Sequence, residues 1–366
     1  MIDGQRIAIV LLSAIGDVVH ALPLVASLKA AAPRSRIEWI IQPIPAHLAR
    51  YHPAVDRVWL FERKNGWRAY RDLRRSLKGQ RFDLAIDLQV YAKASFVTAL
   101  LDADRKIGFD KSRARELNWL ATTERIPAHP PGHVADQYLE FADYLGVPRR
   151  YEWSLPLSDD ERAAQAAFFQ GITAPVAALV VGTSKRVKEW PADRWARVAE
   201  GLVDRWGYEV MIVGGPSPTE DELARAIALE AKVPVHDARH PDLRRLLWQL
   251  DGSALVIGLD TGPYHIAVAL GVPSIGLFGY VDPARVGPTH RFLDLVVDAW
   301  RNPGEPWRPR HDPRGARVLA IDPEEVLEKV ELARARYPRA KNGPSRTEPS
   351  STSGPSSSSG SSGGSE

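Results

Sequence analysis

Residues 6–23, RIAIVLLSAIGDVVHALP, contain the pattern from which the architecture of the chain can be worked out. Residues 7–12, which follow Arg6, are all aliphatic, and the stretch 6–12 is therefore predicted to be a buried strand. Residues 18–31 have the length and periodicity of a helix. Asp17 therefore stands at a helix start, beyond the carboxyl end of a strand, where open α/β sheets form their ligand clefts. A carboxylate in that place would also serve as a helix N-cap.

The same alternation of apolar strands and amphipathic helices continues along the chain. Further strands are predicted at 36–41, 57–61, 84–88, 106–109, 176–181, 209–213, 233–236, 254–257 and 273–277. Further helices are predicted at 67–78, 92–101, 159–170, 192–206, 219–229, 242–249 and 264–270. This alternation favours parallel sheets covered by helices on both faces. The two sets of strands predict an α/β fold of two doubly wound, Rossmann-like domains that face each other across a cleft.

The domain boundary is expected between residues 146 and 175, where GVPRR precedes a proline-containing stretch. We divide the chain into an N-terminal domain, 1–155, and a C-terminal domain, 156–320. A helix within 321–340 is expected to cross back onto the N-terminal domain. Residues 341–366 are almost entirely Ser, Gly, Pro and Thr, which predicts a disordered tail.

The composition excludes several classes of function. With 366 residues, 44% of them hydrophobic, the chain is long enough to bury a sizeable core, and its net charge of +3 is too small for a nucleic-acid partner. The lack of cysteine excludes disulfides and thiolate chemistry. The first apolar run, 7–12, lacks the basic flank of a signal peptide, so we expect a cytoplasmic protein. The uncharged stretch 262–281 contains four glycines and two prolines, and we interpret it as a buried helix and strand.

A second loop with chemical potential is VGTSKRVKEWP, residues 181–191, between a predicted strand and helix. The hydroxyls of Thr183 and Ser184 and the charge of Lys188 suit a diphosphate. The loop does not match the GxxxxGK[ST] phosphate-binding motif, and the chain contains no GxGxxG. A solvated basic loop is the alternative interpretation.

The third loop is GLDTGPYHIA, residues 258–267. Asp260 and Thr261 follow a strand, Gly262 permits close approach of the backbone, and a proline at the first helical position fixes the helix entry. Free N–H groups at such a helix start bind phosphate. A purely structural turn is the alternative. The tripeptide Asp102-Ala103-Asp104 matches a DxD metal motif, but we interpret it as a loop and expect no metal site.

Together these loops resemble glycosyltransferase family 9, the ADP-heptose:lipopolysaccharide heptosyltransferases. The resemblance runs from about residue 6 to residue 337. It is most specific in SAIGDVVHALP at 13–23, KEWP at 188–191 and DTGPYH at 260–265. The segments DLQ at 87–89 and GFD at 108–110 look most like heptosyltransferase I, the type that adds the first heptose.

The resemblance implies a GT-B fold, with the acceptor in the N-terminal domain and the donor in the C-terminal one. It makes Asp17 the general base in an inverting, metal-independent transfer of heptose from ADP-L-glycero-D-manno-heptose, with no cofactor. The donor residues that it implies are Thr183, Ser184, Lys188, Asp260, Thr261, Gly262 and His265. Many relatives carry an acidic residue soon after a strand-end glycine, and Glu220 is taken as its shifted equivalent.

The implied acceptor is the anionic Kdo region of lipid A, a lipid of the inner membrane, so peripheral contact with the cytoplasmic face of that membrane is expected. Six basic residues in N-domain loops form the expected acceptor rim: Arg63, Lys64, Lys93, Lys111, Arg113 and Arg115. Solvated surface loops are the alternative for these six. Other functions left open are a heptosyltransferase II- or III-type enzyme, a relative with another nucleotide sugar or acceptor, and a non-catalytic nucleotide-sugar-binding protein.

Overall fold

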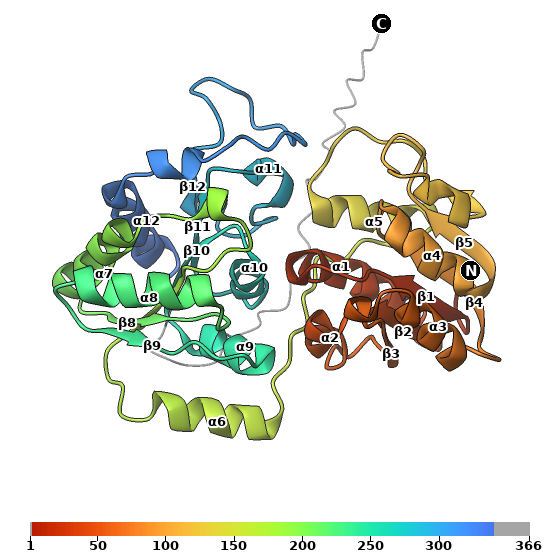
Figure 1. Cartoon of the computed structure of the whole chain (residues 1–366), viewed down its shortest axis with the longest axis horizontal. Coiled ribbons are helices and arrows are strands. Elements are labelled where there is room, and N and C mark those ends of the chain that lie inside the picture. The colour runs from red at the N-terminus through yellow and green to blue at the C-terminus, as the bar shows by residue number, and fades with distance from the viewer. Residues whose placement is uncertain (1, 340–366) are drawn as a thin grey trace, which may run out of the picture.

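Two six-stranded parallel sheets form the centres of two domains, which lie next to each other in Figure 1. The computed structural model describes residues 2–339. The N-terminal sheet has the order β3-β2-β1-β4-β5-β6, with β1 Arg6–Val10, β2 Arg36–Ile41, β3 Arg57–Leu60, β4 Arg81–Asp87, β5 Asp102–Gly108 and β6 Glu124–Arg125. The C-terminal sheet has the order β12-β11-β10-β7-β8-β9, with β7 Val176–Val180, β8 Glu209–Ile212, β9 Val235–Asp237, β10 Leu255–Leu259, β11 Ser274–Phe278 and β12 Val296–Asp298.

Both sheets have the Rossmann strand order, with the first strand of each domain, β1 or β7, in the middle. β7, β10 and β11 are buried at every residue, as expected for parallel strands with helices on both faces. In each sheet the strand order reverses at the central strand, so the loops that follow β1 and β7 lie beside the crevice where such folds bind ligands. The two crevices face each other.

The helices connect successive strands and cover the sheets (Figure 1). In the N-terminal domain they are α1 Ile15–Ala31, α2 Pro43–Ala49, α3 Trp67–Ser76, α4 Ala92–Leu100 and α5 Val134–Tyr144. In the C-terminal domain they are α6 Asp159–Phe169, α7 Ala192–Trp206, α8 Pro218–Glu230, α9 Leu243–Gly252, α10 Gly262–Ala269, α11 Pro283–Val286 and α12 Pro323–Arg336. The predicted boundary at 155/156 falls in the segment between α5 and α6.

The predicted two-domain α/β architecture is confirmed, and several details differ. The short strands β6 and β12 and the helices α2, α5 and α11 were not predicted. The Asp102-Ala103-Asp104 tripeptide begins β5 instead of forming a loop, because it pairs with β4 in the register Arg81↔Asp102. Residues 262–281 form α10 and β11, as expected. Within residues 2–339, no helix is both long and apolar enough to cross a membrane.

The last described helix does not follow the expected path. α12 packs against α7, β11 and β12, all in the C-terminal domain. Its apolar residues Val326, Leu327 and Val330 are buried in the core of that domain. The expected crossing onto the N-terminal domain is therefore replaced by packing on the domain from which the helix emerges. The predicted disordered tail, 341–366, lies outside the described residues.

The two domains meet where the N-terminus of α1 crosses the N-terminus of α10. A β-carbon at Gly16 would lie 2.9 Å from His265 Cδ2, and one at Gly262 would lie 2.7 Å from Ile15 Cβ. Glycine at both positions therefore allows the two helix starts to touch. One apolar cluster continues across this junction, from Val18 and Leu22 in α1 to Ile266 and Ala267 in α10.

A stability measurement tests the position of α12. A β-carbon at Gly201 in α7 would lie 2.6 Å from Leu327 Cδ1, so Gly201→Val should overpack this contact and lower the free energy of unfolding by about 1–3 kcal/mol. In a Leu327→Ala background the same substitution should cost less, because the added methyl groups enter vacated space. Urea unfolding of the four proteins of this double-mutant cycle gives the coupling. Strictly additive losses would contradict the packing of α12 on α7.

Candidate active site

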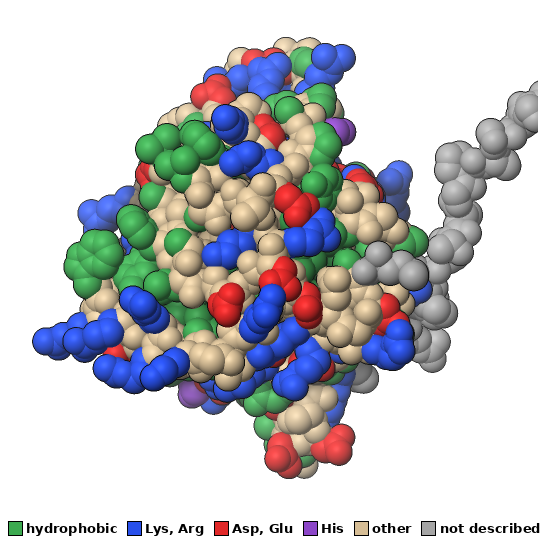
Figure 2. Space-filling view, turned by 90° about the vertical axis from the view of Figure 1, so that its right-hand side faces the viewer, with side chains coloured by type: hydrophobic (Ala, Val, Ile, Leu, Met, Phe, Trp, Pro, Cys, Tyr) green, Lys and Arg blue, Asp and Glu red, His purple; other side chains and the backbone are tan. Residues whose placement is uncertain are grey.

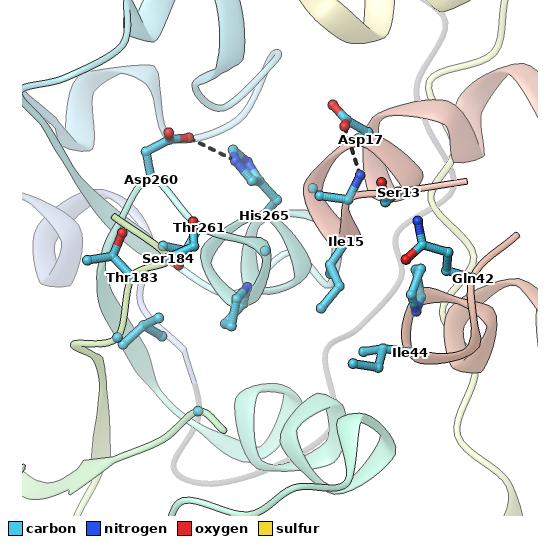
Figure 3. A pocket seen from close by; sticks show the side chains of 18 of the residues that line it. Ser13, Ile15, Asp17, Gln42, Ile44, Thr183, Ser184, Asp260, Thr261 and His265 are labelled. Carbon is cyan, nitrogen blue, oxygen red and sulfur yellow. Dashed lines mark hydrogen bonds and ion pairs between the residues drawn. The ribbon is translucent and has the colours of Figure 1, made fainter. Parts of the chain in front are cut away.

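A cleft of about 990 Å³ lies between the two domains and is lined by the loops at the carboxyl ends of their strands (Figure 3). Its N-domain wall comes from the loops after β1, β2 and β3. Its C-domain wall comes from the loops after β7, β8, β10 and β11. A volume of this size is large enough for a drug-sized or nucleotide-sized ligand. The lining contains Asp17, Arg63, Lys64, Thr183, Ser184, Lys188, Glu220, Asp260, Thr261, Gly262 and His265.

Asp17 is the carboxylate of the N-domain wall. It is the third residue of α1, and its Oδ2 accepts a hydrogen bond of 2.9 Å from the backbone N–H of Ala14 at the helix start. One carboxylate oxygen of Asp17 therefore caps the helix start, as the alternative interpretation predicts. Among residues 2–339, no donor is bonded to Oδ1, and the side chain is partly exposed to the cleft.

The environment of Asp17 raises its pKa. Burial among protein atoms is the main cause, and the Ala14 N–H and the positive charges of Arg285 and Lys93 oppose it. A carboxylate with a raised pKa is a stronger base than an ordinary aspartate. It is therefore better matched to accepting a proton near neutral pH.

On the opposite wall, Asp260 links Lys188 to His265. Lys188 Nζ lies 2.6 Å from Asp260 Oδ2, and His265 Nε2 lies 3.1 Å from Asp260 Oδ1. Burial alone would raise the pKa of Asp260, but the His265 hydrogen bond and the Lys188 charge outweigh it and lower the pKa to about 2. The three side chains thus form a fixed polar group, each at least 85% buried. Lys188 is held in place before any ligand arrives.

The N-terminus of α10 supplies a second positive feature on this wall. Thr261 is the N-cap residue, and its hydroxyl donates to the Leu259 carbonyl instead of capping the helix. The first-turn N–H groups of α10 therefore donate no hydrogen bond to the Thr261 side chain. The helix dipole places partial positive charge at this helix end. Together with Lys188, this helix end suits a diphosphate.

Glu220, which is predicted as the shifted equivalent of an acidic residue in many relatives, also lies on the C-domain wall of the cleft. It is in the first turn of α8, and the side chain packs onto Gly182, where a β-carbon would lie 1.6 Å from Glu220 Oε1. Burial raises the pKa of this carboxyl. Gly182 directly precedes Thr183 and Ser184, so Glu220 reaches the loop that was predicted to bind the donor.

The six basic residues of the predicted acceptor rim separate into two groups. Arg63 and Lys64 line the cleft, and the Lys93 charge acts on both Asp17 and Arg63. Arg115 is exposed and outside the cleft lining, and its charge reaches His311 in the C-terminal domain.

The other two rim residues make contacts within their own domain. Lys111 Nζ lies over the Trp119 ring, 4.4 Å from its centroid. The Arg113 guanidinium binds the carboxylates of Asp110 and Glu140 and the carbonyl of Pro127. These partners within the N-terminal domain satisfy the donors of Arg113, so the structure does not support its predicted contact with the acceptor.

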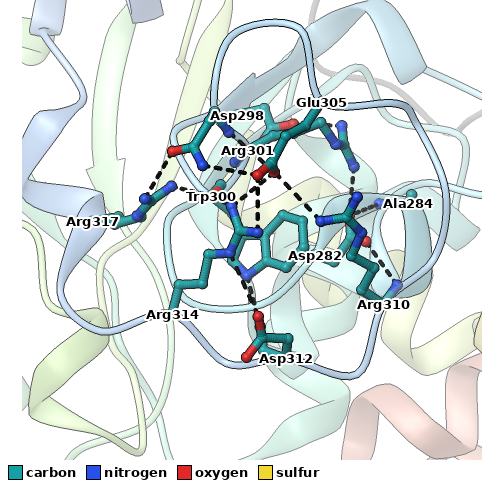
Figure 4. A network of polar contacts seen from close by, with 11 residues as sticks. Asp282, Ala284, Asp298, Trp300, Arg301, Glu305, Arg310, Asp312, Arg314 and Arg317 are labelled. Atoms are coloured by element: carbon teal, nitrogen blue, oxygen red, sulfur yellow. Dashed lines mark hydrogen bonds and ion pairs between the residues drawn. The ribbon is translucent and has the colours of Figure 1, made fainter.

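The cleft also contains an arginine that the sequence patterns did not single out. Arg285 in α11 lines the cleft, and its positive charge reaches Asp17. The start of α11 is fixed by Asp282, which is buried and accepts hydrogen bonds from the N–H of Ala284 and from the Arg301 side chain (Figure 4). Asp282-Pro283 after β11 repeats the strand, aspartate, proline, helix order seen after β10. That repetition is the signal from which Arg285 could have been found.

Comparison with known proteins agrees with this geometry. The sequence profile of Glycosyltransferase family 9 (heptosyltransferase) matches residues 70–303. The chain belongs to glycosyltransferase family 9. The match includes the loops around Lys188 and Asp260 and begins after Asp17. The chain is therefore a glycosyltransferase.

Individual relatives of this family cover most of the chain. It is 31% identical over 298 residues to the lipopolysaccharide core heptosyltransferase OpsX of Haemophilus influenzae, covering 81% of this chain and 85% of that protein. It is 29% identical to lipopolysaccharide heptosyltransferase 1 of Pseudomonas aeruginosa, covering 77% and 81%. The crystal structure of the Escherichia coli heptosyltransferase WaaC with ADP is similar with a TM-score of 0.69 at 26% identity, covering 90% and 98%.

A substitution within the predicted donor loop tests the C-domain wall of the cleft, with ADP as the probe. Lys188→Ala should weaken ADP binding at least tenfold, because a charged hydrogen bond contributes about 1.5–3 kcal/mol. Isothermal titration calorimetry measures the affinity. Lys185→Ala is the matched control: it removes the same charge from the same loop, but Lys185 is exposed and outside the cleft lining. Equal affinities of both variants would remove Lys188 from the diphosphate site.

Proposed function

We propose that this glycosyltransferase moves a heptose from ADP-heptose to the Kdo region of a lipid A precursor, with inversion at the anomeric carbon. One observation carries the proposal: a carboxylate with a raised pKa and a diphosphate-type site form opposite walls of one cleft. The WaaC relative supports the donor, because its structure contains ADP.

The proposed mechanism follows from the positions of the walls. The donor diphosphate binds Lys188, the hydroxyls of Thr183 and Ser184, and the N-terminus of α10. The free oxygen of Asp17 accepts the proton of an acceptor hydroxyl as that hydroxyl attacks the anomeric carbon. The attacking oxygen comes from the N-domain wall and the diphosphate departs toward the C-domain wall, so the displacement inverts the anomeric centre.

Charge that develops on the departing diphosphate is stabilised by groups that are already in place. Lys188 is fixed by Asp260, and the first turn of α10 is fixed by its contact with α1. Preorganised donors of this kind need no reorganisation at the moment of reaction. We propose that they supply the stabilising charge, so that the transfer is independent of a metal and of any cofactor.

The first-heptose step is the best-supported step of core synthesis. OpsX and the heptosyltransferase 1 proteins of Pseudomonas aeruginosa, Salmonella typhimurium and Escherichia coli share 27–31% identity over more than three quarters of the chain, and the heptosyltransferase 1 of Campylobacter coli shares 22%. A heptosyltransferase 3 shares 23%. An acceptor that ends in Kdo presents carboxylates, and Arg63, Lys64 and Arg285 offer guanidinium and ammonium groups at the cleft. Since this acceptor is a membrane lipid, we also propose peripheral contact with the cytoplasmic face of the inner membrane.

A transfer assay tests the proposal directly. Purified protein is incubated with ADP-heptose and either Kdo₂-lipid A or an acceptor that already carries the first heptose. We expect mass spectrometry to show one added heptose on the Kdo-terminated acceptor at a rate at least tenfold higher. Preference for the heptose-primed acceptor would move the protein to a later step. Binding of ADP-heptose without transfer to either would support a non-catalytic binding protein.

Asp17→Asn tests the general base. The substitution should lower the transfer rate about 10²–10⁴-fold, because the amide cannot accept the proton, and should leave ADP affinity within a few-fold. In the unmodified enzyme the raised pKa means that the active carboxylate is lost as the pH falls through that pKa, so the rate should decline at a higher pH than for an ordinary aspartate.

The matched control for this test is Asp104→Asn, the same change on β5 at a carboxylate that pairs with Arg81 outside the cleft. It should leave the rate and the pH profile unchanged. An Asp17→Asn enzyme with full activity would remove Asp17 from the mechanism.

A further inference from the structure

An exposed face of the N-terminal domain combines large apolar side chains with arginines. It is formed by α3, α4 and the short helix η2, Asn118–Ala121, and we call it the α3–α4 face. Trp67 is 75% exposed, Phe96 52%, Leu117 61% and Leu120 63%. In Figure 2, hydrophobic and basic side chains gather along the left edge of this domain. Such a concentration of exposed large apolar residues marks an interaction surface.

The aromatic side chains of this face contact one another. The rings of Trp67 and Phe96 are 5.9 Å apart, and Tyr70 lies 5.5 Å from the first and 5.9 Å from the second. The Tyr70 hydroxyl donates to the carbonyl of Lys93 in α4, which ties the two helices together. The Trp67 side chain is nevertheless 75% exposed, so most of its surface remains available to a partner.

The charge around these rings is strongly positive. Residues 62–78 contain seven Lys and Arg and two acidic residues, whereas the whole chain has a net charge of only +3. Within residues 2–339, no carboxylate lies within 4.0 Å of the charged groups of Arg68, Arg74 or Lys78. All three are exposed. Ala69 and Leu73 of α3 are buried and Tyr70 and Asp72 are partly buried, and the other residues of the helix are exposed to a partner.

The α3–α4 face continues directly into the cleft. The short helix η1, Arg63–Asn65, leads through Gly66 into Trp67. Arg63 and Lys64 line the cleft on its acceptor side. A surface that binds this face is therefore next to the place where an acceptor headgroup would enter.

We propose that the α3–α4 face docks the enzyme on an anionic phospholipid bilayer. Trp and Tyr favour the interface between headgroups and acyl chains, and a basic cluster is attracted to anionic lipid. The orientation rests on the proposed function, since it would present a lipid acceptor to Arg63 and Lys64. A second copy of this chain fits less well, because a symmetric dimer through this face would bring two cationic helices together.

Vesicle flotation of the full chain tests the docking face. The probes are vesicles of phosphatidylethanolamine with phosphatidylglycerol and vesicles of phosphatidylcholine alone. We expect binding to the first that is weakened by salt, and little binding to the second. The pair Arg68→Glu with Arg74→Glu should weaken binding at least tenfold, because each basic residue near an anionic surface contributes about fivefold. The pair Trp67→Ala with Phe96→Ala should also weaken it.

Matched controls lie on α8 of the C-terminal domain. Leu229 is 85% exposed and Arg225 is exposed, so Leu229→Ala and Arg225→Glu make comparable changes away from the face and should leave binding unchanged. Equal losses from the α8 variants, or unchanged binding of both α3–α4 variants, would overturn the proposal. Failure of the unmodified chain to bind anionic vesicles would also overturn the proposal. A dimer found by light scattering in place of vesicle binding would be one such outcome.

A second readout separates this proposal from the transferase proposal. On a short-chain acceptor dispersed without vesicles, the Trp67→Ala/Phe96→Ala enzyme should transfer at the unmodified rate, and on acceptor embedded in anionic vesicles it should be at least fivefold slower. Equal slowing on both acceptors would assign these residues to folding or catalysis and overturn the docking role. Vesicle binding by a chain that transfers no heptose would leave the docking face standing and remove the proposed reaction.

Discussion

The contact between the helix starts of α1 and α10 is the constraint on which the site depends. Each helix follows a central strand of its own domain, so the contact brings the two strand-end crevices together. Gly16 and Gly262 make it possible, because a β-carbon at either position would enter the space of a residue across the junction. The general-base candidate is one residue after Gly16, and the diphosphate-type helix end begins at Gly262. A change that separates these helices would separate the two halves of the chemistry.

The junction also contains two buried histidines, His20 and His133, whose side chains carry no charge at neutral pH. The ring of His20 lies 4.6 Å from that of His265 and 5.2 Å from that of His133. His133 Nε2 is 2.9 Å from the Gly287 carbonyl of the other domain. Burial lowers the pKa of His133 to about 4 and that of His20 well below its ordinary value. The contribution of these groups to stability is present at neutral pH and is lost as the pH falls below about 6.5 toward 4.

The sequence predicts the parts of this structure that depend on local pattern. Apolar strands, turn glycines and the Asp17 and Asp260 loops follow from neighbouring residues, and the structure places all three predicted loops around one cleft. Features set by distant partners were missed, and so were the helices α2, α5 and α11. Arg113 looks like a free loop cation until Glu140, 27 residues later, is folded beside it. No local pattern in α12 indicates that it packs on α7. The contact depends on Gly201 in α7, which leaves room for Leu327.

The central claim is that the N-domain carboxylate and the C-domain diphosphate site act on the same sugar. A crystal structure of the protein with ADP-2-deoxy-2-fluoro heptose measures this directly. The account predicts that the diphosphate contacts Lys188 and the first turn of α10, and that the face of the anomeric carbon opposite the diphosphate is open toward Asp17. A heptose turned away from Asp17, with another group facing that side of the anomeric carbon, would contradict it.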